Sequence, residues 1–149
     1  MINETVKLKG DLVITVLDKD GKVKERREEK NLIVSAGLTF ICSRMANATA
    51  GVMSHMAVGS GTTTPAASNT DLGTVLGARE PLDSTTASSN TVTYVSSFEA
   101  GEGTGAVTEA GLFNAASSGT MLCRTVFPVV NKGANDTMAI TWIITLSAS

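Results

Sequence analysis

The sequence predicts a mainly β protein, an antiparallel sandwich or barrel, and three observations support this. Its 149 residues include 20 Thr and 14 Ser; β-branched Thr suits a half-exposed sheet surface, and Ser, Thr and Gly suit turns. Only 4% of the residues are aromatic, so the core must consist of Val, Ile, Leu, Met and Ala. From residue 90 onward, apolar and polar residues alternate in segments separated by turn-formers, which is typical of antiparallel sheets. A chain of this length forms one domain.

The first predicted element is a hairpin within residues 11–34. Residues 12–17 are rich in β-branched types and predict a strand, and Asp-Lys-Asp-Gly at 18–21 predicts a turn because Gly21 can take positive φ. The return stretch, residues 22–30, is almost entirely charged. A strand of this kind must be an exposed edge or lie against another surface. Two interpretations stay open: a solvated hairpin whose charges protect the edge, and a docking arm.

The next predicted element is one short helix over residues 35–48. Ser35 can cap its start. The spacing predicts one apolar stripe, formed by Leu38, Ile41, Cys42 and Met45.

The middle of the chain predicts a strand over residues 52–61, a loop after it, and a short helical turn at 71–79. Strongly alternating segments then predict the remaining strands, at residues 90–98, 106–115, 120–130 and 136–146.

The glycine-rich stretch GEGTGAV, residues 101–107, raises the question of a phosphate site. A phosphate loop needs GxxxxGK[ST], and a dinucleotide site needs GxGxxG between a strand and a helix. Here the glycines run G-x-G-x-G between predicted strands, and no Lys or Arg lies between Arg79 and Arg124. The stretch therefore predicts a hairpin turn or a loop at one end of a sandwich, with structural turn residues Gly101, Gly103 and Gly105.

Other catalytic interpretations also lack support in the sequence. The carboxylates Glu99, Glu102 and Glu109 could pair as in a glycosidase, but no aromatic platform accompanies them, and turn carboxylates are usually solvated. The single histidine, His55, is expected to be packed and satisfied. We therefore predict no enzyme activity and no catalytic, cofactor-binding or metal-binding residues.

The cysteines and the net charge limit which ligands and partners the sequence supports. Cys42 and Cys123 are expected to be small buried hydrophobes, since two distant Cys and one His make no zinc site. The formal charge of −2 argues against nucleic acid or an anionic membrane as a partner. The polar N-terminus predicts no signal peptide, and no apolar run is long enough to span a bilayer. Synthesis in a cytoplasm is expected.

Charge is unevenly distributed along the chain. Residues 1–30 hold 8 Lys or Arg and 7 Asp or Glu, so 15 of the 26 charges lie there. This predicts a charged hairpin arm, residues 1–30, and a sandwich domain, residues 31–149. Alternating opposite charges favour specific pairing with a partner over general stickiness. The candidate contact residues are Lys22, Lys24, Glu25, Arg26, Arg27, Glu28 and Glu29.

Residues 31–146 resemble a family of small tailed-bacteriophage virion proteins. The specific parts are HMAVGSG at 55–61, TEAGLFNA at 108–115, RTVF at 124–127 and KGANDTMAITW at 132–142. Related patterns occur in stand-alone capsid cement (decoration) proteins and in tail-fibre modules. The resemblance implies a jelly-roll sandwich without catalytic or cofactor residues. It also implies structural corners whose backbone conformation other residues resist, at Gly59, Gly61 and Gly111.

The resemblance implies a cement protein that bridges and stabilises capsomers of a phage head. Its expected partners are the major capsid protein and further copies of itself, as a dimer or trimer, on the capsid surface after synthesis in the host cytoplasm. The alternative is a tail-associated protein: a fibre, baseplate or adaptor module. A carbohydrate-binding module would need exposed aromatic residues, whereas Trp142 and Tyr94 lie in alternating strands where burial is expected.

Overall fold

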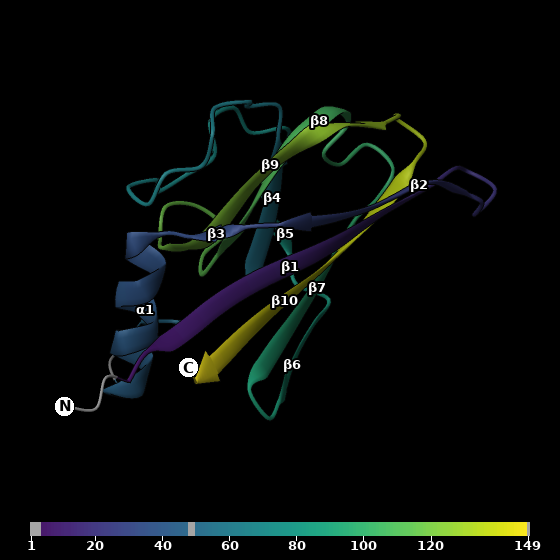
Figure 1. The fold of residues 1–149 in the computed structure, drawn as a ribbon. Helices are drawn as coiled ribbons and strands as arrows, with labels where there is room; N and C mark the ends of the chain where they lie inside the picture. The colour runs from purple at the N-terminus through teal and green to yellow at the C-terminus, as the bar shows by residue number, and fades with distance from the viewer. Residues whose placement is uncertain (1–3, 48–49, 149) are drawn as a thin grey trace.

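The computed structural model describes residues 4–47 and 50–148, which form two antiparallel sheets packed face to face, with one helix beside them (Figure 1). The first sheet has the order β2-β1-β10-β7-β6 and the second β3-β9-β8-β4-β5. The predicted mainly β sandwich is confirmed; its jelly-roll type stays a prediction. The elements are β1 Val6–Leu17, β2 Val23–Lys30, β3 Leu32–Ile33, α1 Ser35–Met45, β4 His55–Gly59, β5 Glu80–Pro81, β6 Ser84–Ser88, β7 Thr91–Phe98, β8 Gly105–Phe113, β9 Met121–Lys132 and β10 Thr137–Ala148.

The first and last strands form the middle of the first sheet. β1 and β10 pair along their whole lengths, from Val6 opposite Ala148 to Leu17 opposite Thr137. Side chains alternate between the two faces of a strand, and the predicted apolar face of β10 is confirmed as the core face, centred on the fully buried Trp142. β1 adds three buried side chains to the same core, namely Leu12, Ile14 and Val16. The sequence division at residue 30 therefore does not coincide with a break in the core.

The helix exists where it was predicted, although residue 48 lies outside the described residues. Ser35 does not cap it, because the N-cap position falls on Val34 and no side-chain cap hydrogen bond is formed. The predicted stripe is also wrong: Leu38, Cys42 and Met45 are exposed. The buried residues are Gly37 and Phe40. A Cβ on Gly37 would lie 2.2 Å from the backbone oxygen of Leu122, so the close approach of helix and β9 selects this face.

Residues 60–79 form an irregular layer over the outer face of the second sheet. The helical turn expected at 71–79 is absent, and Val75 instead bridges to Gly59 of β4. Leu76 N donates to Val58 O of β4 at 2.8 Å, and the N–H groups of Gly73 and Thr74 donate to a buried carboxylate. This covering buries β8 on both faces from Val107 to Phe113.

Candidate assembly surface

Among the described residues, none forms a layer over the outer face of the first sheet, which divides into two unlike parts. Opposed residues of neighbouring strands share a face, so the register assigns the outward side chains. On β10 and β7 none of them is charged. We call this set the uncharged field: Ala139, Thr141, Ile143 and Thr145 of β10, and Thr91, Thr93, Val95 and Ser97 of β7. The other part comprises β1, whose outward side chains include Lys9 and Asp11, and the β2 edge, where seven of the eight residues are charged.

Four of the seven predicted contact residues form ion pairs or hydrogen bonds with other residues of the chain. Lys24 Nζ lies 2.5 Å from Asp136 Oδ2. Arg27 donates to the backbone oxygens of Pro128, at 2.9 Å, and Val129, at 3.3 Å, in β9 of the other sheet. Arg27 also pairs with Glu25 and Glu29. These side chains brace the hairpin against the sandwich.

The other three predicted contact residues face solvent. Arg26 and Glu28 pair with each other at 3.0 Å, with 56% and 69% of their side chains exposed, and Lys22 is exposed beside the turn. Strand alternation turns residues 25, 27 and 29 toward the body and residues 26 and 28 away from it, whereas Lys24 reaches Asp136 from an exposed position. This alternation of side chains between the two faces of a strand can be read from the sequence. We call Lys22, Arg26 and Glu28 the charged edge.

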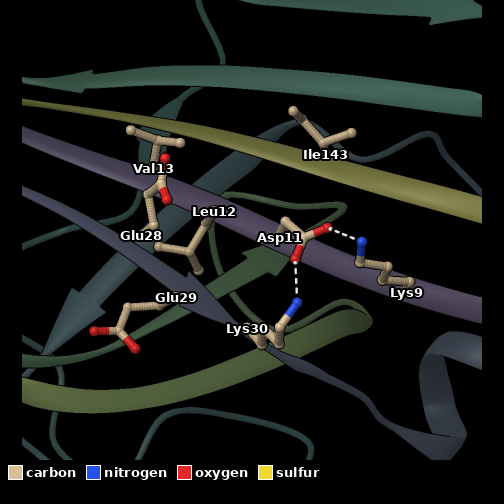
Figure 2. A pocket seen from close by; sticks show the side chains of 8 residues that line it. All are labelled: Lys9, Asp11, Leu12, Val13, Glu28, Glu29, Lys30 and Ile143. Carbon is tan, nitrogen blue, oxygen red and sulfur yellow. Dashed lines mark hydrogen bonds and ion pairs between the residues drawn. The ribbon is translucent and has the colours of Figure 1, made fainter.

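A shallow groove between β1 and β2 joins the charged edge to the uncharged field (Figure 2). Asp11 lies in it, 3.1 Å from both Lys9 and Lys30. Partial burial would raise the pKa of Asp11, but the two ammonium groups outweigh it and lower the pKa below its usual value. Ile143 of the uncharged field also lines the groove. The two parts of the surface are thus contiguous.

Glu109 differs from its expected role as a solvated turn carboxylate. It lies inside β8, fully buried, and its Oε2 receives Arg124 Nη2 at 2.8 Å. Gly61, Gly73 and Thr74 donate their backbone N–H groups to it, at 2.9, 2.9 and 2.8 Å. Burial would raise the pKa of Glu109, but these N–H groups and Arg124 lower it below its usual value. The carboxylate ties the 60–79 layer to the sheet.

The predicted corner glycines are required for space rather than for unusual backbone angles. Gly59, Gly61 and Gly111 do not have positive φ. A Cβ would lie 2.5 Å from Glu109 Oε1 at Gly59 and 2.4 Å from it at Gly61. The backbone of Thr74 also excludes a Cβ at Gly59, and the side chains of Phe113 and Leu72 crowd one at Gly111. The reason given in the prediction was therefore wrong.

The GEGTG stretch is the end loop rather than a hairpin turn. It connects β7 of the first sheet to β8 of the second. Its three glycines have positive φ, of 85° at Gly101, 59° at Gly103 and 140° at Gly105, a backbone conformation that favours glycine. Gly105 is already the first residue of β8.

The remaining candidate groups take structural positions. His55 is half-buried, with Nδ1 2.8 Å from Ser54 Oγ. Cys123 is buried as expected, but Cys42 is exposed on α1, and both are free. Trp142 and Tyr94 are buried, as the alternation predicted. Within residues 4–47 and 50–148, no three His, Cys, Asp or Glu are grouped to hold a metal, and no helix is long and apolar enough to cross a membrane.

Comparisons with protein-family models, curated proteins and solved structures find no match to this chain. The family resemblance therefore depends on the sequence motifs named above.

Proposed function

We propose that this chain is a non-enzymatic virion structural protein, a cement (decoration) protein that bridges neighbouring capsomers of a tailed-phage head. The observation that carries the proposal is the division of one uncovered sheet face into the charged edge and the uncharged field. The motif resemblance points to the same role.

The two surfaces suit two different contacts. Alternating opposite charges, as in Arg26 and Glu28, give register and specificity in a protein contact more than raw affinity. The uncharged field can be covered by a neighbouring protein without the cost of burying an unpaired charge. We assign the charged edge to the major capsid protein and the uncharged field to a second protein neighbour on the shell.

The bracing of the hairpin favours such a contact. Arg27 fastens β2 to β9 through two backbone oxygens, and Lys24 fastens it to Asp136. Holding the contact residues in one geometry before binding lowers the entropy cost of association. Once one capsomer is bound, the second contact is effectively intramolecular, so many weak bridges add up over a shell.

The test measures binding to capsids from a phage strain that lacks this protein. The charge swap Arg26→Glu with Glu28→Arg keeps the net charge and the mutual pair but inverts the pattern. Because both side chains are mostly exposed, the fold should be retained while capsid binding weakens by at least about tenfold, or about 1.4 kcal/mol.

The matched control is Lys7→Glu, an exposed position near the start of β1. It changes the net charge without touching the charged edge, so binding should stay near that of the wild type. Undiminished binding by the charge swap would refute the role of the charged edge. Failure of the wild type to bind capsids would refute the cement function.

A further inference from the structure

The four outer strands of the two sheets differ in how their free edges are protected. Exposed edges invite pairing with other chains, and proteins block them with charge, proline or very short strands. β2 carries seven charges in eight residues. β3 and β5 have two residues each, and β5 contains Pro81. β9 continues beyond β3, but this part contains Pro128, and Arg27 occupies the oxygens of residues 128 and 129.

β6 has none of these protections. It runs Ser-Thr-Thr-Ala-Ser from Ser84 to Ser88, and all five residues are exposed. It pairs with β7 on one side, from Ser84 opposite Val95 to Ser88 opposite Thr91. On its other side lies no strand of the described residues. The backbone groups on that side are available to an added strand.

We propose that β6 is a self-association edge that pairs antiparallel with β6 of a second copy about a twofold axis at Thr86. The sequence of the strand fits its own reverse. Thr86 faces Thr86 of the second copy, Ser84 faces Ser88, and Thr85 faces Ala87. Every opposed pair is small and uncharged, and Thr–Thr is a favourable cross-strand pair. A twofold contact of this kind uses the same patch on both copies.

The nearest charge supports the same register. Asp83 directly precedes β6, where its carboxylate accepts a 2.7 Å hydrogen bond from Ser97 Oγ. In the proposed pairing Asp83 faces Ser89 of the second copy, so no like charges meet. The dimer joins two first sheets into one continuous sheet, with both uncharged fields on the same side. The proposal does not depend on the cement function.

Five paired residues bury less area than a standard stable interface, so the free dimer should be weak. The test therefore traps it covalently. Directly opposed residues have Cα atoms about 4.5–5.5 Å apart, within the span of a disulfide. In a Cys42→Ser background, which removes the exposed thiol, Thr86→Cys should form a disulfide-linked dimer under mild oxidation.

Thr141→Cys in the same background is the control, because it lies on the uncharged field two strands away from β6. It should remain monomeric. Separately, Thr86→Lys places two ammonium groups at the axis and should weaken self-association at least about tenfold in sedimentation velocity, whereas Thr141→Lys should not. Absence of a Thr86→Cys dimer, or equal or stronger cross-linking through Thr141→Cys, would overturn the proposal.

Discussion

Glu109 and Arg124 form a fully buried ion pair, with Nη2 and Oε2 2.8 Å apart on adjacent strands of the second sheet. Arg124 Nη1 also donates to Asn69 Oδ1 at 3.1 Å. Both members of the pair thus contact the 60–79 layer, which has no regular secondary structure. This layer covers the outer face of the second sheet, whereas no layer of the described residues covers the outer face of the first.

Arg124→Met should destabilise the protein strongly. It leaves the Glu109 carboxylate buried without its countercharge, which typically costs about 3–5 kcal/mol. Urea unfolding followed by the fluorescence of Trp142, the single tryptophan, measures the free energy of unfolding. Adding Glu109→Gln removes the uncompensated charge and keeps an acceptor for the loop N–H groups. The double variant should therefore be more stable than Arg124→Met alone; a further loss would contradict the account.

The Glu109 carboxylate should also make stability depend on acid pH. Its pKa in the folded protein lies below the ordinary 4.5, so its stabilising effect is present above that value and is lost as pH falls through the folded pKa. Glu109→Gln should therefore be less stable than the wild type at neutral pH. The difference should shrink below about pH 4.5. Both proteins contain the other carboxylates, including Asp11 and Asp136, so the contribution of these groups cancels when the urea midpoints are compared. A difference in stability that does not change with pH would contradict the prediction.

Gly61→Ala should loosen the 60–79 layer, because its Cβ would lie 2.4 Å from Glu109 Oε1 and 2.8 Å from Cδ. We expect a loss of about 1–3 kcal/mol, as for overpacking, and faster amide exchange in residues 60–79. Gly51→Ala is the control, since its Cβ would find its nearest atom 4.0 Å away, and it should change stability by less than about 0.5 kcal/mol. Equal effects would show that space at Gly61 does not matter.

Tyr94, the single tyrosine, should ionise at unusually high pH. Burial, followed by the nearby Cys123, raises its pKa to about 12. Since an unfolded tyrosine ionises near 10, this group stabilises the folded state below that pH, and the effect is lost as pH rises toward 12. Absorbance of the phenolate gives the titration directly. A midpoint near that of free tyrosine in the folded protein would contradict its burial.

The long strands were predictable from sequence because alternation along β7 and β10 reports directly which side chains face the core. The short strands β3, β5 and β6 were not predicted. The exposure of the β2 edge was predictable because a strand with seven charges in eight residues cannot lie inside a sheet. The face of α1 was not, because it depends on the contact between Gly37 and the backbone of Leu122, far away in the chain. Likewise, nothing local to Glu109 shows that Arg124 and the 60–79 layer surround it. Alternation alone divides residues 25–29 into two faces, but which face contacts the body depends on the position of β9, whose carbonyls accept from Arg27.

The copy number per virion tests the central claim most directly. Quantitative mass spectrometry of purified particles would compare this chain with the major capsid protein. The cement function predicts many copies in a simple whole-number ratio to the capsid protein, as symmetric decoration requires. A few copies per particle would place the chain in the tail, and absence from the particle would contradict a virion role altogether.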